Sequence, residues 1–245
     1  MSFTVHAITI DLDDTLWPFA PVGARIEHVL HDWMREHSPC TAEAFPVAAM
    51  RVLREQVVAD HPALAHDMGA LRRLTIAHAL RDSGADAALL DAAYEAFYAA
   101  RNDVTCYPDS LDALARIAAR LPVAALTNGN ADLTRIGLDH HFRFALGAHE
   151  HGAAKPDPGI FQAACARLEC APDAVLHVGD HAEMDVAGAA RAGLRTCWIN
   201  RANDAGALRQ WRHDTVTPDL HFHTLCALAD WLDATQPTPT RTTLA

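Results

Sequence analysis

The sequence predicts an α/β fold in which a parallel sheet core carries an inserted all-helical domain. From Pro108 onward, short apolar runs with strand character alternate with amphipathic segments, and this alternation is typical of parallel sheets with helices on both faces. Before that point, about 85 residues of purely helical pattern separate the first strand from the next, which is too long for a simple strand-to-strand crossover. The helical stretch is therefore expected to form a domain of its own.

The change of pattern sets the expected domain boundaries. Residues 1–17 and 107–234 are predicted to form the sheet domain, and residues 18–106 the helical insertion. The tail at 235–245 is rich in Thr and Pro and is expected to be disordered.

The first strand is the apolar, β-branched run Val5–Ile10, which leads directly into the acidic sequence DLDDT at residues 11–15. Because side chains alternate along a strand, Asp11 and Asp13 can share a direction near its end. Two carboxylates this close repel unless a cation or a shared proton intervenes, and Mg²⁺ is a common partner of such carboxylates. A strand followed by an Asp-rich turn with a helix cap is the simpler alternative.

The insertion contains apolar residues at helical spacing. This spacing predicts helices at Val22–His37, at Thr41–Ala59, between an N-cap at Asp67 and a stop at Gly84, and at Ala85–Arg101. Trp17 and Phe19, close to the start of the insertion, are candidates either for a hinge or pocket or for core packing.

The sheet domain continues with alternating elements. Its predicted strands are Val123–Leu126, Phe142–Leu146, Val175–Val178, Thr196–Ile199 and Leu220–Phe222. Its predicted helices are Leu111–Leu121, Ala131–Leu138, Pro158–Leu168, Met184–Ala192 and Leu225–Leu232.

Polar residues follow one of these strands directly, in the sequence TNGN at residues 127–130. Thr127, the Asn128 side chain and the backbone N–H groups around Gly129 can cradle phosphate oxygens. The alternative is a plain turn in which Asn130 caps the next helix.

Two further polar clusters occur along the chain. Lys155 precedes Pro156 and can neutralise a phosphate or a carboxylate, although an exposed lysine is more often simply solvated. The strand that ends at Val178 leads into Asp180, and Asp185 follows five residues later. Helix capping explains either aspartate alone, but it does not explain why the polar clusters recur at strand ends.

Taken together, DLDDT at residues 11–15, Thr127-Asn128, Lys155-Pro156 and the stretch from Asp180 to Asp185 resemble, in order, the four signature motifs of the haloacid dehalogenase-like hydrolases. The resemblance extends from about Val5 to Asp233. It implies a Rossmann-like parallel sheet core with an inserted all-helical cap domain. Residues 127–131, 177–180 and 185–189 are also similar to a bacterial group of riboflavin-pathway phosphatases, which act on flavin mononucleotide and 5-amino-6-(5-phosphoribitylamino)uracil.

The resemblance implies a role for each acidic residue. Asp11 is the expected nucleophile, which forms an aspartyl-phosphate. Asp13 is the expected acid for the leaving alcohol and then the base for water. Mg²⁺ is expected to bind Asp11, Asp180 and the main-chain carbonyl of Asp13, with Asp185 in a supporting role.

The remaining motif residues are expected to bind the transferring phosphoryl group. These are Thr127, Asn128, Gly129 and Lys155, of which Thr127 and Lys155 also count as catalytic. Family members that displace halide lack the second aspartate, so Asp13 favours phosphate-ester hydrolysis. A phosphomutase or phosphotransferase, and a non-catalytic phosphometabolite-binding module, remain as alternatives.

Composition limits the expected partners. The formal net charge is -11, and a nucleic-acid surface needs clustered Lys and Arg. No apolar run approaches the roughly 20 residues of a membrane span, and no signal peptide is evident at the N-terminus. The six cysteines contain no CxxC pair and are expected to be reduced. We therefore expect a cytoplasmic monomer or homodimer that binds a small phosphorylated metabolite.

Overall fold

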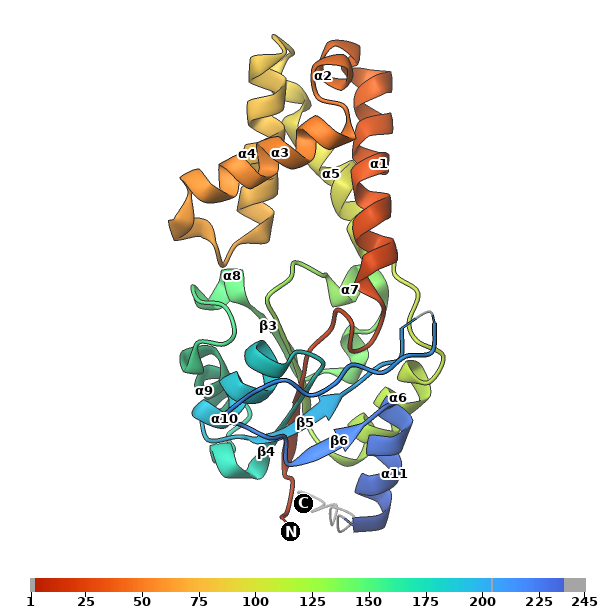
Figure 1. Ribbon diagram of the computed structural model, residues 1–245, viewed down its shortest axis with the longest axis vertical. Helices are drawn as coiled ribbons and strands as arrows, with labels where there is room; N and C mark the ends of the chain where they lie inside the picture. The colour runs from red at the N-terminus through yellow and green to blue at the C-terminus, as the bar shows by residue number, and fades with distance from the viewer. Residues whose placement is uncertain (1–2, 204, 236–245) are drawn as a thin grey trace, which may run out of the picture. The chain divides into compact units, whose positions relative to one another are not determined.

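The computed structural model describes residues 3–203 and 205–235, and these form two compact units (Figure 1). The sheet unit consists of the chain up to Pro18, the segment Thr105–Thr127 and the chain from Gly137 onward. The helical unit consists of Phe19–Val104 and Asn128–Ile136. Its second segment was predicted to belong to the sheet domain, so that part of the prediction was wrong. Of the tail at 235–245, all but Thr235 lies outside the described residues.

The sheet unit is built on parallel strands (Figure 1), which confirms the predicted α/β class. The described strands follow the order β3-β2-β1-β4-β5-β6, and every neighbouring pair is parallel. Their bounds are β1 Ala7–Ile10, β2 Val123–Thr127, β3 Phe144–Gly147, β4 Val175–Gly179, β5 Arg195–Ile199 and β6 Leu220–Phe222. Every residue of β1, β2 and β4 is buried, as is usual for strands covered on both faces.

Helices complete the sheet unit. They are α6 (Ser110–Arg120), α8 (Ala148–His151), α9 (Pro158–Arg167), α10 (Gly188–Arg191) and α11 (Leu225–Thr235). Phe161 and Ala164 of α9 and Ala189 of α10 pack with Leu126 and Val175 of the sheet, and α11 packs against α6. In residues 3–203 and 205–235, the structure has no helix with both the length and the apolar character needed to cross a membrane.

The helical unit contains α1 (Phe19–His37), α2 (Pro39–Ala44), α3 (Val47–Asp60), α4 (Met68–Asp82), α5 (Leu90–Asn102) and α7 (Leu133–Ile136). Helices α1 and α5 run side by side (Figure 1) and share an apolar core that includes Leu30, Met34 and Phe97. The predicted N-cap of α4 is confirmed, because the Asp67 carboxylate accepts a hydrogen bond from the Ala70 N–H at 2.8 Å.

Three predicted helices in this unit differ from the structure, and the first of them, Ala85–Arg101, begins only at Leu90. The predicted helix Thr41–Ala59 is divided between α2 and α3, because Pro46 cannot donate the N–H that a continuous helix needs. The predicted helix Ala131–Leu138 is reduced to α7. Its cap is Asp132 rather than Asn130, since the Asp132 carboxylate accepts from the N–H groups of Thr134 and Arg135.

Two predicted elements of the sheet unit also differ. The strand predicted at Phe142–Leu146 is displaced to Phe144–Gly147. The helix predicted at Met184–Ala192 begins two residues earlier, as a π-helical segment at Ala182–Ala187, and continues as α10. The side chain of His181 starts this segment by accepting hydrogen bonds from two of its first N–H groups.

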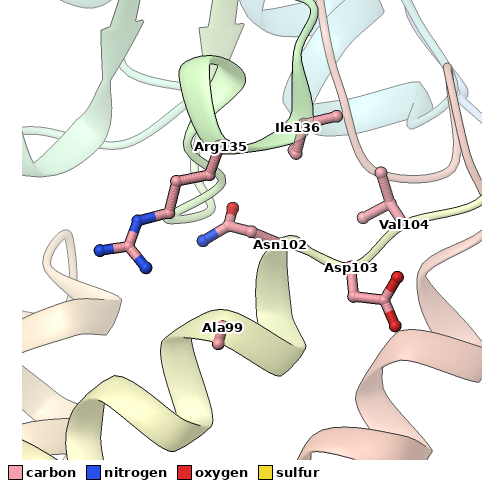
Figure 2. A pocket seen from close by; sticks show the side chains of 6 residues that line it. All are labelled: Ala99, Asn102, Asp103, Val104, Arg135 and Ile136. Atoms are coloured by element: carbon pink, nitrogen blue, oxygen red, sulfur yellow. The ribbon is translucent and has the colours of Figure 1, made fainter.

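A cavity of about 480 Å³ opens within the helical unit (Figure 2). It is lined by Ala99, Asn102, Asp103, Val104, Arg135 and Ile136. Its polar side chains are engaged by neighbours, because Asn102 Oδ1 accepts from the Asp132 N–H at 2.7 Å and the Arg135 guanidinium pairs with Glu95. These contacts join α5 to the segment around α7. We therefore interpret the cavity as a packing gap left between these two segments.

Candidate active site

Three buried carboxylates lie together beyond the C-terminal ends of the neighbouring strands β1 and β4. They belong to Asp11, Asp180 and Asp185, and one oxygen of each lies within 4.8 Å of the others. Asp11 follows β1 directly, and its N–H donates to the Val178 carbonyl at 2.9 Å. Asp180 follows β4 directly. Since parallel strands end at the same edge of a sheet, residues far apart in the sequence converge here.

Lys155 contacts two of these carboxylates. Its Nζ donates to Asp11 Oδ1 at 2.7 Å and to Asp185 Oδ1 at 2.6 Å. Only 2% of the side chain is exposed, so the interpretation of Lys155 as a solvated surface residue is wrong. The lysine lies just before α9, whose first turn is fixed by the N-cap Asp157.

A series of buried hydrogen bonds that runs from Thr9 through His177 holds Asp185 in place. Thr9 Oγ1 lies 2.9 Å from His177 Nδ1, and His177 Nε2 lies 3.1 Å from Asp185 Oδ1. Burial lowers the pKa of His177, so we assign a neutral ring that donates from Nε2 and accepts at Nδ1. The other Asp185 oxygen accepts from the His181 N–H at 2.9 Å. The position of this carboxylate is therefore set by several donors.

Gly179 leaves the space that Asp185 occupies. A Cβ atom at position 179 would lie 2.3 Å from Asp185 Cγ and 2.4 Å from its Oδ2. Atoms cannot approach this closely, so any side chain at position 179 displaces the carboxylate.

We expect Gly179→Ala to lower the free energy of unfolding by about 1–3 kcal/mol, because the new methyl group forces Asp185 away from Lys155. Urea unfolding at neutral pH measures this change. The matched control is the same substitution in an Asp185→Gly background, where its cost is expected to fall to near zero. An equal cost in both backgrounds would show that the clash with Asp185 is not the cause.

The electrostatics of the three carboxylates differ. Burial raises the pKa of Asp11 well above its usual range, with Asp180 and Asp185 adding to the effect and Lys155 opposing it. Burial and the Asp185 charge raise the pKa of Asp180 to about 6. Although burial opposes it, the Lys155 ammonium and the His177 hydrogen bond hold the pKa of Asp185 well below its usual range. Because the pKa values of Asp11 and Asp180 are raised, ionising these carboxyl groups costs free energy. A further cation beside them would lower that cost.

The donor set fits Mg²⁺. Hard carboxylate oxygens from Asp11, Asp180 and Asp185 lie close enough to share one small cation, and carboxylates are the protein ligands that Mg²⁺ usually takes. Lys155 and His177 already hold Asp185 Oδ1, which suits Asp185 to a supporting position beside the ion.

Asp13 lies outside this carboxylate group. Its Oδ1 accepts from the Trp17 Nε1–H at 2.8 Å, and Trp17 is completely buried. Core packing is therefore confirmed for Trp17, which also orients Asp13. The roles of the Asp13 carboxylate as acid and base, and of its main-chain carbonyl as a metal ligand, stay predictions.

The predicted phosphate cradle is divided between the two units. Thr127 ends β2, which pairs directly with β1, and it is buried in the sheet unit. Asn128 and Gly129, the next two residues, belong to the helical unit and are half-buried. Binding of phosphate oxygens by these residues stays a prediction.

Sequence reasoning missed two residues that contact the carboxylate group. His177 lies in the stretch 177–180 that resembles the riboflavin-pathway phosphatases, but nothing in the sequence indicates that it supports Asp185. Arg209 lies between β5 and β6 and pairs with Asp180 Oδ2 at 3.0 Å. No periodic pattern or motif surrounds Arg209, so the sequence offers no local signal for this contact.

The chain is similar to several known proteins. The family described as haloacid dehalogenase-like hydrolase matches residues 5–193. The 5-amino-6-(5-phospho-D-ribitylamino)uracil phosphatase YigB of Escherichia coli (strain K12) is 32% identical over 91% of this chain and 94% of its own length. The phosphoserine phosphatase of Thermus thermophilus is 37% identical over 57% of this chain and 58% of its own length.

Solved structures show the same fold. The crystal structure of a 2-haloacid dehalogenase from Pseudomonas syringae pv. Tomato DC3000 matches with a TM-score of 0.85 and 36% identity, over 94% of this chain and 99% of that chain. Similar relatives therefore include both phosphatases and a dehalogenase.

Proposed function

The chain belongs to the haloacid dehalogenase-like hydrolases, and on that premise we propose that it is a Mg²⁺-dependent phosphatase of small phosphorylated metabolites, acting through an aspartyl-phosphate. One observation carries the proposal: Lys155 holds one oxygen of Asp11 at 2.7 Å, inside a group of three buried carboxylates suited to Mg²⁺. This arrangement fixes an anionic nucleophile beside the cation site that an incoming phosphate needs.

The chemistry follows from the residues around Asp11. An Asp11 oxygen attacks phosphorus and the bond to the alcohol oxygen breaks, while Asp13 gives its proton to that oxygen. Asp13 then takes a proton from water, which attacks the aspartyl-phosphate, releases phosphate and restores the Asp11 carboxylate. The Trp17 N–H keeps Asp13 oriented for both transfers. Mg²⁺, when bound by Asp11 and Asp180, offsets the repulsion between nucleophile and phosphate.

Lys155 and Thr127 provide the remaining stabilisation in this proposal. The Lys155 ammonium holds Asp11 in place and offers positive charge to the phosphoryl oxygens. Asp185, which is held by His177 and the His181 N–H, in turn fixes the position of Lys155. The contacts that orient Asp11, Lys155 and Asp185 are therefore present without substrate.

The similarity to YigB supports a riboflavin-pathway phosphate as the substrate. We propose flavin mononucleotide, 5-amino-6-(5-phosphoribitylamino)uracil or a related sugar phosphate, and a kinetic screen over these compounds and nucleotides ranks them by kcat/KM. All six cysteines are free thiols, which supports a reducing compartment such as the cytoplasm. A monomer or homodimer remains our expectation.

Metal removal tests the proposal directly. We expect the wild-type protein to release phosphate from a generic aryl phosphate with Mg²⁺, and we expect excess EDTA to lower the rate by about 100-fold or more, because the charge stabilisation is lost. Added Mg²⁺ restores the rate. Turnover that is unaffected by EDTA would contradict the metal dependence, and binding of phosphometabolites without turnover would favour the non-catalytic module.

Halide displacement is the second candidate function, because a 2-haloacid dehalogenase shares 36% identity and nearly the whole fold. Asp11 is a suitable nucleophile for either reaction. A leaving alcohol needs a proton whereas a leaving halide does not, so the presence of Asp13 favours the phosphatase. Halide release from 2-chloropropionate, measured beside phosphate release, separates the two. Transfer of the phosphoryl group to a sugar in preference to water would instead indicate a phosphotransferase.

A further inference from the structure

Arg209 contacts Asp180 at two separate places. Its Nη1 lies 3.0 Å from the carboxylate oxygen Oδ2, and its Nη2 donates to the main-chain carbonyl at 3.1 Å. The same carbonyl accepts from Trp198 Nε1 at 2.8 Å. The guanidinium thus has one contact with the carboxylate and another that does not depend on it.

The backbone of Arg209 is fixed beside the end of β5. Asn200, which follows β5, donates from Nδ2 to the Arg209 carbonyl at 2.8 Å and accepts from the Arg209 N–H at 3.0 Å. Only 2% of Asn200 is exposed, and Trp211 packs edge-on against Trp198 with ring centroids 4.9 Å apart. The segment therefore presents its arginine to Asp180 from a set position.

The two cations around the carboxylates differ in how easily they can be displaced. The Lys155 side chain is 2% exposed and holds two carboxylates, whereas the Arg209 side chain is 49% exposed and holds one. Ion pairs of half-exposed arginines are weak and screened by salt. Of the two, Arg209 is the cation that can leave its carboxylate at little cost.

We infer that Arg209 is an exchangeable counter-cation, which competes with Mg²⁺ for the Asp180 carboxylate and so lowers the Mg²⁺ affinity of the site. This inference rests on the proposed Mg²⁺ dependence. Before the metal binds, Arg209 neutralises Asp180. When Mg²⁺ takes the carboxylate, the guanidinium gives up Oδ2 and stays anchored at the carbonyl of Asp180.

Removal of the competing charge is expected to tighten metal binding. Isothermal titration of the full-length protein with MgCl₂, at low ionic strength and without substrate, measures the affinity. We expect Arg209→Gln to bind Mg²⁺ about fivefold more tightly than the wild type. Arg209→Lys keeps the charge and is expected to stay close to the wild-type value. Raising the salt concentration reduces the difference, because the pair is exposed.

The direction of the effect separates this role from a structural one, since damage to the site weakens metal binding. Arg212→Gln is the matched control, because it removes the same charge from an exposed position three residues along the segment. It is expected to leave the affinity within about twofold of the wild type, since exposed charges at a distance are screened.

Two results would overturn the inference: unchanged or weaker Mg²⁺ binding by Arg209→Gln, or an equal gain in Arg212→Gln. Unchanged Mg²⁺ binding together with a raised KM for the aryl phosphate would make Arg209 a substrate contact. These results do not bear on the proposed phosphatase function. That proposal is contradicted only if the wild type shows no Mg²⁺-dependent phosphate release.

Discussion

Asp11→Asn is expected to abolish phosphate release, with kcat lowered by about 10⁴-fold or more, while the folded protein stays at least as stable as the wild type. The amide cannot attack phosphorus, so the covalent route is closed and no other residue in the site replaces it. A loss of this size corresponds to about 5.5 kcal/mol or more of transition-state stabilisation.

The stability half of this prediction follows from the electrostatics. Burial and the neighbouring Asp180 and Asp185 raise the pKa of Asp11, which means that the folded protein favours its uncharged form. A carboxyl group whose pKa is raised by folding destabilises the metal-free fold at neutral pH, and a neutral amide of the same shape removes that cost. The Lys155 ammonium keeps its contact with Asp185 at 2.6 Å in the variant.

Two measurements decide the matter. Phosphate release with saturating Mg²⁺ gives kcat, and urea unfolding in EDTA gives the free energy of unfolding. Asp60→Asn, the same change at an exposed position, is the control and is expected to alter neither quantity. Turnover by Asp11→Asn at the wild-type rate would remove Asp11 as the nucleophile, and an inactive but strongly destabilised variant would contradict the electrostatic argument.

The sequence was sufficient to locate residues that a shared sheet edge brings together. Asp11 and Asp180 could be placed there because each follows an apolar run, and the carboxyl ends of parallel strands meet. The contacts of Lys155 could not be derived in the same way, because its loop has no periodicity; only the family resemblance connected it to Asp11. The depth of its burial came from the structure alone.

Other features were beyond the reach of local patterns. Arg209 reaches Asp180 through a loop whose course depends on reciprocal hydrogen bonds with Asn200, and such pairings leave no trace in nearby residues. Pro46 lies inside the predicted helix Thr41–Ala59, whereas in the structure it separates two helices. The segment Asn128–Ile136 follows a strand of the sheet unit but packs with the helical unit, so its position in the sequence was misleading.

Lys155→Met is expected to inactivate the enzyme and, in the absence of metal, to lower the free energy of unfolding by about 3–5 kcal/mol. The substitution keeps the approximate length and the apolar stem of the side chain, but it leaves Asp11 and Asp185 without the cation that contacts both. Because Asp11 and Asp185 are buried, water cannot solvate the carboxylates that have lost their cation. Activity falls as well, since Asp11 loses the contact that orients it.

Mg²⁺ offers a way to separate the two losses. Binding near Asp11 and Asp180 restores positive charge to the site, so saturating Mg²⁺ is expected to stabilise Lys155→Met more than it stabilises the wild type. Activity is not expected to return with stability, because the metal does not replace the lysine that holds Asp11 and that we propose binds phosphoryl oxygens. Urea unfolding in EDTA and in Mg²⁺, paired with phosphate release, measures both effects.

A double variant tests whether unpaired charge is the cause of the destabilisation. Lys155→Met/Asp185→Asn removes one of the two unpaired carboxylates, so it is expected to be more stable than Lys155→Met alone, although Asp185→Asn by itself is expected to destabilise the wild type. Additive losses in this cycle would mean that the lysine and the aspartate act independently. A Lys155→Met variant as stable as the wild type in EDTA would show that Lys155 does not offset the charge of the buried carboxylates.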